Sequence, residues 1–259
     1  MRTQRPATPD YTASAQRGIG EVRAENVPQV PSWPDPLAQE ALYGLAGEIV
    51  GTIEPHTEAD PAALLLQLLV AFGNIIGHEP HFRTEKDRHG LNLFTVLVGA
   101  TSKARKGISW GHIKELAAIA DEQWSEGCIQ TGLSSGEGLI YAVRDPTNND
   151  PGVSEKRLFV IEQEFASTLR MLTRDGNTLS PTLRLAWDGN TLQILTKQSP
   201  CRATGAHISL VAHVTRNELR RELTSTDMGN GFANRFLWVC VRRSKALPDG
   251  GCAPEAELK

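Results

Sequence analysis

The sequence has few of the features that would assign it to a specialised class of protein. Its 259 residues include only four cysteines, and none of them forms a C-x-x-C pair. A disulfide scaffold or a zinc site is therefore less consistent with this chain than a reduced, cytosolic protein. Acidic and basic residues nearly balance, with a net charge of −3, so a basic surface for nucleic acid would have to be local.

Long apolar runs are also missing. The run ALLLQLLVAF, residues 63–72, is too short to span a membrane and is followed by Gly, Asn and Ile. The N-terminal residues carry charge without the apolar stretch of a signal peptide. We therefore expect a soluble, cytoplasmic protein without a membrane partner. We find no internal repeat at the usual periods.

Composition and periodicity divide the chain into four parts. The first part is rich in Pro, Thr, Gln, Arg and Ser, which is typical of a tail or linker. Next come two helices, the first starting at Pro36 with Leu37, Leu45 and Ile53 on its apolar face, and the second starting at Asp60–Pro61. The predicted parts are a disordered tail (1–35), a helical pair packing on the core (36–80), an NTPase-like core (81–247) and a C-terminal tail (248–259).

The central part alternates apolar strands with amphipathic helices, a pattern that favours a mostly parallel sheet covered by helices on both faces. The expected strands are residues 93–98, 128–131, 157–162, 207–214 and 235–241. The expected helices are residues 107–125, 139–145, 165–176, 180–189 and 217–223, and a hairpin is expected over 192–204. The fold class is therefore α/β, preceded by an N-terminal helical layer.

The stretch GATSKARKGIS, Gly99 to Ser109, resembles a phosphate-binding loop with irregular spacing. Such a loop needs a buried strand, backbone N–H groups at a helix N-terminus, a lysine for the phosphates and a hydroxyl for Mg²⁺. Lys106 lies seven residues after Gly99, one more than usual, and Ser109 lies three after Lys106 instead of one. Phosphate binding and a solvated basic turn both remain open from this stretch alone.

Acidic residues follow another apolar strand. Glu162 ends the run RLFVIE and Glu164 follows two residues later, where a carboxylate of an NTPase holds Mg²⁺ through water and polarises the attacking water. The run HISLVAHVT ends in the polar residues His213 and Thr215, at a place suited to sensing the γ-phosphate. Glu137 in SSGEG is a further candidate carboxylate, although Ser134 or Ser135 capping a helix that has Glu137 in its first turn explains it equally simply.

The chain resembles a family of RecA-like P-loop ATPase domains of formally unknown function, which occur in actinobacteria and their phages beside bifunctional DNA primase/polymerase modules. The resemblance spans about residues 33 to 251. It rests on runs that include NLFTVLVGATSKARKGISW, GLSSGEGLI, RLFVIEQEFASTL, GNTLSPTLRLAWDG, TGAHISLVAHVTRNELRREL and NGFANRFLWVCVRRSK.

The resemblance implies a helicase-like ATPase in DNA replication, with ATP and Mg²⁺ as ligands. Lys106 would be the phosphate lysine, Ser109 (or Thr101 or Ser102) the Mg²⁺ hydroxyl, and His213 the sensor. The acidic pair would be catalytic, with Glu162 also near the metal. An arginine of an adjacent subunit in a ring would complete the site. The remaining nucleotide-binding positions would be Gly99, Lys103, Ala104, Arg105 and Gly107.

Arg235 is the first candidate for that arginine and Arg216 the second, and an internal salt bridge explains Arg235 as well. RecA-like motors place their DNA loops after the acidic strand, so single-stranded DNA would contact residues there. The candidate positions are Arg170, Arg174, Arg184, Lys197 and Arg202, for which a solvated helix face is the simpler account. The family pattern also leads us to expect a longer chain, of which this one would be a fragment or a shortened form. The alternative function is a nucleotide-binding or structural adaptor that tethers a primase or another replication partner.

Overall fold

Five parallel strands form the central sheet of the computed structural model, which describes residues 33–100, 106–195 and 201–251. They are β3 (Phe94–Gly99), β4 (Ile129–Gln130), β5 (Arg157–Glu162), β8 (His207–Thr215) and β9 (Leu237–Val241). Their order across the sheet is β4-β5-β8-β3-β9, and every neighbouring pair is parallel. The predicted α/β class with a parallel central sheet is confirmed.

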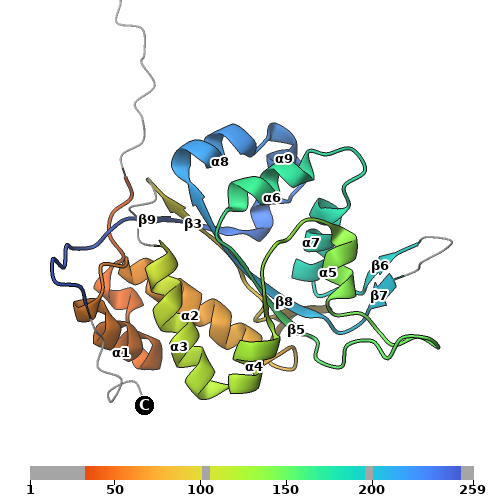
Figure 1. Ribbon diagram of the computed structural model, residues 1–259, viewed down its shortest axis with the longest axis horizontal. Coiled ribbons are helices and arrows are strands. Elements are labelled where there is room, and N and C mark those ends of the chain that lie inside the picture. Colours follow the sequence, from red (N-terminus) through yellow and green to blue (C-terminus); the bar gives the residue numbers. More distant parts are fainter. Residues whose placement is uncertain (1–32, 101–105, 196–200, 252–259) are drawn as a thin grey trace, which may run out of the picture. The chain divides into compact units, whose positions relative to one another are not determined.

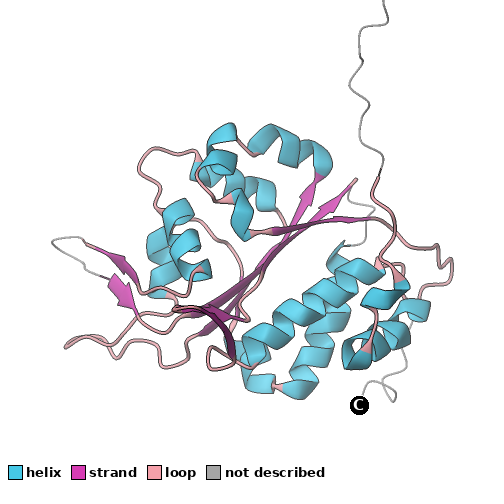
Figure 2. Cartoon of the chain, turned by 180° about the vertical axis from the view of Figure 1, so that it is seen from behind, coloured by secondary structure: helices cyan, strands magenta, loops and turns pink. Residues whose placement is uncertain are grey.

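Side chains leave the strands alternately toward two apolar layers, because successive residues of a strand point to opposite faces. In β5, Leu158 and Val160 join one buried cluster, whereas Phe159 and Ile161 join the other. Figure 1 shows helices on both faces of the sheet, and Figure 2 shows the same layers from behind. The strands have apolar residues on both faces because both faces are covered.

The first face carries α1 (Gly44–Ile53), α2 (Pro61–Ile75), α3 (Lys106–Ala120) and α4 (Glu122–Gly127). The predicted start of α2 is confirmed, since the Asp60 carboxylate accepts the Ala62 N–H at 3.0 Å and Pro61 occupies the first turn. The predicted helix over 107–125 is instead two helices, because Asp121 leaves helical geometry and caps α4 by accepting the Trp124 N–H.

The predicted start of the first helix is wrong, and its predicted buried face is confirmed only in part. A 3-10 turn (Gln39–Ala41) precedes α1, which begins only at Gly44, where φ is +59°. A positive φ is compatible with glycine but not with a continuing right-handed helix. Leu45 is 71 % exposed instead of buried, whereas Ile53 is buried as predicted, together with Val50.

The second face carries shorter helices, which lie on the other side of the sheet in Figure 1. They are α5 (Gly136–Tyr141), α6 (Phe165–Leu172), α7 (Leu179–Trp187), α8 (Arg216–Glu222) and α9 (Ser225–Gly229). A 3-10 turn at Ala233–Arg235 then leads into β9. Four of these helices were predicted within a few residues, whereas α9 was not.

Two small antiparallel pairs complete the described part of the chain. The predicted hairpin is confirmed as β6 (Leu192–Ile194) and β7 (Cys201–Ala203). The pair β1 (His81–Thr84) and β2 (Asp87–Gly90) was not predicted, because its residues are polar on both faces and almost all exposed. Such a pair lacks the alternation that identifies a half-buried strand.

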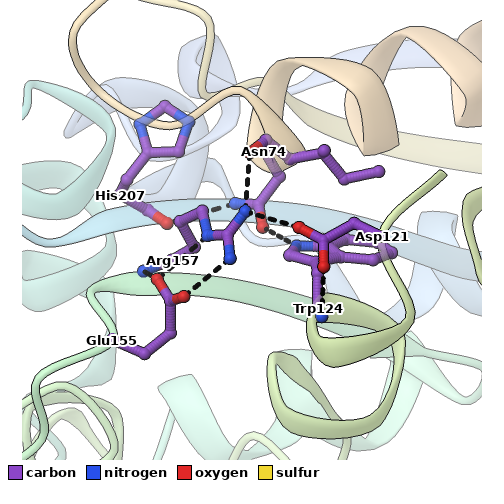
Figure 3. A network of polar contacts seen from close by, with 7 residues as sticks. Asn74, Asp121, Trp124, Glu155, Arg157 and His207 are labelled. Atoms are coloured by element: carbon purple, nitrogen blue, oxygen red, sulfur yellow. Dashed lines mark hydrogen bonds and ion pairs between the residues drawn. The ribbon is translucent and has the colours of Figure 1, made fainter.

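A network of polar contacts ties α2 to the amino ends of β5 and β8 (Figure 3). The buried Asn74 amide donates to the Leu158 and His207 carbonyls and to the Ser209 hydroxyl, and its oxygen accepts the Trp124 indole N–H at 2.7 Å. Nearby, Arg157 pairs with Asp121 at 2.9 Å and Glu155 at 2.7 Å. Both the nitrogen and the oxygen of the Asn74 amide are hydrogen-bonded, so this network fixes the fold at the amino edge of the sheet.

The chain divides into a unit of residues 1–34 and a unit of residues 35–259. The predicted tail therefore ends close to the boundary between these units, and its first 32 residues lie outside the described residues. The predicted helical pair shares a buried cluster with Phe159, Ile161 and Val211 of the sheet and is part of the second unit. No helix in the described ranges is long and apolar enough to cross a bilayer.

Candidate functional site

The carboxyl ends of the five strands meet at one edge of the sheet, where the connections of two adjacent strands diverge. The chain leaves β3 toward α3 on the first face, and it leaves β8 directly into α8 on the second face. In open α/β sheets, ligands bind outside the carboxyl ends of strands at such a divergence. We call the side chains at this edge, Lys106, Glu162, Glu164, His213, Arg216 and Glu218, the carboxyl-edge cluster.

Lys106 is the first residue of α3 and is half-buried. Burial lowers the pKa of its ammonium, and the Glu218 and Glu164 carboxylates partly oppose this effect. Neither carboxylate forms a direct ion pair with Lys106, and its ammonium has no hydrogen-bond partner among the described residues. A partly desolvated cation without a direct partner is suited to binding an anion.

Ser109 is fully buried, and its hydroxyl donates to the Lys106 carbonyl at 2.7 Å within the first turn of α3. This arrangement offers no exposed Ser109 oxygen to a metal ion at the edge. Its role as a metal ligand stays a prediction that this geometry does not favour. Gly99 ends β3, as predicted, and Gly107 is exposed in the first turn of α3.

Five of the predicted nucleotide-binding residues lie outside the described residues. They are Thr101, Ser102, Lys103, Ala104 and Arg105, between the end of β3 and the start of α3.

The two predicted acids follow β5 as expected, but in different surroundings. Glu162 is 8 % exposed, and its carboxylate accepts the Leu133 N–H at 2.7 Å, which holds the segment after β4. Glu164 is exposed at the start of α6, and its side chain makes no capping hydrogen bond. Glu164 is therefore the more accessible carboxylate at this edge.

The acidic strand β5 is not a direct neighbour of β3, because β8 lies between them. Neighbouring strands are about 4.8 Å apart, so β5 and β3 are separated by roughly 10 Å. The end of β8 fills this gap with His213 and the helix that follows. Its Thr215 accepts the Glu218 N–H, and the Glu218 carboxylate accepts the Thr215 N–H and hydroxyl in return. This capping box lowers the pKa of Glu218.

His213 is only 3 % exposed, and its Nε2 lies 3.1 Å from the Gln67 amide nitrogen on α2. Burial, together with the positive charge of Lys106, lowers the pKa of His213 to about 4. The imidazole is therefore neutral near pH 7. The strand end predicted for His213 is confirmed, and its role as a sensor stays a prediction.

Glu137 occupies the position that helix capping predicts. The Ser135 hydroxyl accepts the Gly138 N–H at 3.0 Å as the cap of α5, and Glu137 lies in the first turn. The Thr178 hydroxyl donates to the exposed Glu137 carboxylate at 3.0 Å. These contacts account for Glu137 as a structural residue.

Arg235 is engaged within its own chain. It lies before β9, at the amino edge of the sheet, 3.3 Å from Asp188, and it donates to the Gly231 carbonyl at 3.0 Å. Its guanidinium also lies over the Trp187 ring at 5.6 Å. The internal salt bridge considered for Arg235 is therefore present. Arg216, by contrast, is half-buried at the start of α8 and forms no ion pair with another described residue.

The arginines considered for DNA differ in how they are used. Arg170 contacts Glu222 at 3.2 Å, and Arg184 donates to the Asn230 carbonyl at 2.9 Å. Arg174 and Arg202 are exposed, and no ion pair is found for either among the described residues. Lys197 lies outside the described residues.

A cavity of about 430 Å³ lies away from this edge, beside α5 and the open edge of β4. Its lining includes Arg144 and Arg157, which are already paired with Asp150 and with Glu155. The cavity therefore brings no unpaired charged group to a ligand, and the carboxyl-edge cluster remains the better candidate site.

Sequence reasoning missed two members of this region. Glu218 was hidden in an ordinary helix start, although the pattern T-x-x-E is a capping-box signal. Gln67 was assigned to a buried structural helix, and a polar residue within the run LLLQLLV was the signal that could have identified it.

Comparisons with known proteins assign this chain to no family. No family model matches the chain, and a search of curated proteins gives no match. The described residues also contain no group of three or more His, Cys, Asp or Glu side chains that could hold a metal ion. The candidate function therefore depends on the geometry of the carboxyl-edge cluster.

Proposed function

We propose that the chain binds ATP with Mg²⁺ at the carboxyl edge of its sheet and hydrolyses it, as a helicase-like protein of DNA replication with a RecA-like fold. The observation that carries this proposal is the partly desolvated Lys106 at the start of α3, beside Glu164 and Glu218 and without a direct ion-pair partner among the described residues. The N-terminus of α3 adds the positive end of a 15-residue helix. The strand order, with β3 between β8 and β9, is compatible with this fold.

Most side chains of the cluster have a role in this proposal. Lys106 neutralises the terminal phosphates, and Glu164 orients the water that attacks the γ-phosphate. His213 responds to the γ-phosphate from the end of β8. Arg216 replaces Arg235 as our first candidate for the arginine that stabilises the transferred phosphoryl group, because Arg235 is paired with Asp188.

The fit to Mg²⁺ depends on carboxylate oxygens. Glu162 uses its Oε1 for the Leu133 N–H and keeps a second oxygen, and Glu164 is exposed. Mg²⁺ keeps several of its waters and needs only one or two protein carboxylates when phosphates supply further ligands, so the free oxygen of Glu162 fits the ion and Glu164 is left for the attacking water. When bound, Mg²⁺ would neutralise negative charge on the phosphates.

The DNA-related part of the proposal depends on exposed cations. Arg174 and Arg202 are accessible for phosphate contacts, which would be independent of sequence and sensitive to salt. Single-stranded DNA is the proposed nucleic acid, and a primase/polymerase and a homo-oligomeric ring are the proposed assemblies.

A second candidate function is an adaptor that binds nucleotide weakly and ties a primase to its partner. The observation in its favour is Ser109, whose hydroxyl is buried against the Lys106 carbonyl at 2.7 Å and not exposed at the edge. This candidate function predicts either that the chain binds ATP without hydrolysing it, or that it neither binds nor hydrolyses ATP.

ATP hydrolysis by the wild type and by Lys106→Ala, with and without single-stranded DNA, tests the proposal. We expect turnover in the wild type and a loss of about 100-fold or more in Lys106→Ala, because phosphate charge would lose its nearest cation. Lys114→Ala is a matched control, since Lys114 lies two turns later on the same helix. Turnover absent from the wild type, with no rise of Tm on adding Mg·ATP, would contradict the proposal, and binding without turnover would favour the adaptor.

A further inference from the structure

Gln67 of α2 forms a buried polar pair with His213 of β8. Gln67 is fully buried, His213 is 3 % exposed, and the Gln67 amide nitrogen lies 3.1 Å from His213 Nε2. The other buried residues nearby on α2 are apolar, including Leu64, Val70 and Ala71. The pair is therefore a polar link between the helical layer and the end of a central strand.

The hydrogen bonds of this pair do not satisfy the Gln67 amide. Its oxygen, Oε1, is buried and has no hydrogen-bond partner in the described part of the chain. Exchanging the amide nitrogen and oxygen would bring the oxygen to His213 and leave the nitrogen without a partner instead. A half-satisfied buried amide destabilises a fold relative to an apolar side chain of similar size. Stability of the core alone therefore does not account for Gln67.

His213 connects this amide to the carboxyl-edge cluster. The Lys106 charge is close enough to lower the pKa of His213. Two residues after His213, Thr215 lies opposite Gly99 in the β3–β8 ladder, where the segment between β3 and α3 begins. A change of charge near Lys106 therefore affects the imidazole that contacts Gln67.

We propose that Gln67 is a positioning residue of the nucleotide site, which holds His213 in the orientation and tautomer that distinguish ATP from ADP. This inference rests on the proposed function and extends the site to α2, whose buried Asn74 forms its polar contacts at the opposite, amino edge of the sheet. An amide N–H that donates to Nε2 leaves the proton on Nδ1, since a neutral imidazole has one donor and one acceptor nitrogen. The Nδ1–H is then the donor available toward an anion.

Affinities of Mg·ATP and Mg·ADP, measured by calorimetry for four proteins, test this inference. The proteins are the wild type, Gln67→Met, His213→Asn and the double variant. Losing a neutral hydrogen bond that orients a donor should weaken Mg·ATP binding about 3- to 10-fold and leave Mg·ADP within about twofold. If Gln67 acts through His213, the double variant binds Mg·ATP no more weakly than His213→Asn alone.

Val70→Ala is the control, because Val70 is fully buried on α2 but apolar. It should lower Tm and leave the ratio of ATP to ADP affinity unchanged. Nitrogen-15 NMR of the wild type tests the tautomer without any variant, and an Nε2–H imidazole would overturn the inference even if Gln67→Met fails to fold. The inference would also be overturned if Gln67→Met bound Mg·ATP as tightly as the wild type. It would be overturned as well if the losses of affinity in the two single variants added up in the double variant. A wild type that binds neither nucleotide would contradict the proposed function itself.

Discussion

Gly99 lies directly opposite Thr215 in the parallel ladder of β3 and β8. The segment after β3 and the helix after β8 therefore leave the sheet at neighbouring positions. Thr215 also forms the capping box with Glu218, and the Glu218 carboxylate raises the pKa of Lys106, partly opposing the effect of burial. The backbone register and a helix cap thus fix the position of the Glu218 carboxylate, a negative charge near Lys106.

Glu164→Gln should lower ATP turnover about 100-fold, because an amide cannot accept a proton from the attacking water. Mg·ATP affinity should change little, since the phosphates contact other groups. Glu137→Gln is the matched comparison, and we expect wild-type turnover from it, because Glu137 contacts Thr178 as part of the α5 start. Steady-state phosphate release measures both. The reverse pattern would move the catalytic carboxylate to Glu137.

Arg216→Ala and Arg235→Ala should affect different properties. Arg216 has no ion-pair partner among the described residues, so its loss should lower turnover by about 100-fold or more and leave Tm nearly unchanged. Arg235→Ala removes the contacts with Asp188 and the Gly231 carbonyl and should lower the free energy of unfolding by about 1–2 kcal/mol. Turnover per folded molecule and urea unfolding measure the two effects. Full turnover in Arg216→Ala with loss in Arg235→Ala would restore Arg235 as the catalytic arginine.

The sequence was most informative where one local interaction decides the structure. Asp60–Pro61 predicted the start of α2, and RLFVIE predicted β5 with Glu162 at its end. The start of the first helix was misplaced because its apolar pattern continues across Gly44, where a positive φ interrupts the helix. Periodicity identifies the type of an element and its buried face, but it does not say which element lies beside it.

Contacts between distant parts of the chain explain what was missed at the candidate site. Gln67 and His213 are 146 residues apart, and only the packing of α2 on β8 joins them. The position of β8 between β3 and β5 follows from strand pairing, which no local pattern encodes. Lys106, Glu162 and Glu164 were identified from residue type and spacing, whereas Glu218 required the fold.

Asn74→Ala should lower the free energy of unfolding by about 3 kcal/mol, because it removes several buried hydrogen bonds and leaves the Trp124 indole N–H without its acceptor. Urea denaturation measures the change, and Gln163→Ala, at an exposed position, is the control. Trp124→Phe in the Asn74→Ala background should cost less than in the wild type, since the N–H is already unpaired. A loss below about 1 kcal/mol for Asn74→Ala would contradict the structural role of this network.

Acid should destabilise the protein through His213 before its carboxylates are protonated. The pKa of His213 is about 4 in the folded chain, against an ordinary value of about 6.5. Below pH 6.5 His213 is therefore protonated in the unfolded chain, whereas in the folded chain it stays neutral until about pH 4. Stability from this residue is complete above pH 6.5 and is lost as the pH falls toward 4. The loss between pH 7 and pH 5 should be about 2 kcal/mol.

Urea denaturation of the wild type and of His213→Asn at pH 7 and pH 5 measures this contribution. His207 has a lowered pKa for the same reason, burial, and remains in both proteins, so its contribution cancels in the comparison. We expect the free energy of unfolding to fall by about 2 kcal/mol less in His213→Asn than in the wild type between these pH values. Equal losses in the two proteins would mean that His213 is solvated and titrates normally, which would also remove the basis for its pairing with Gln67.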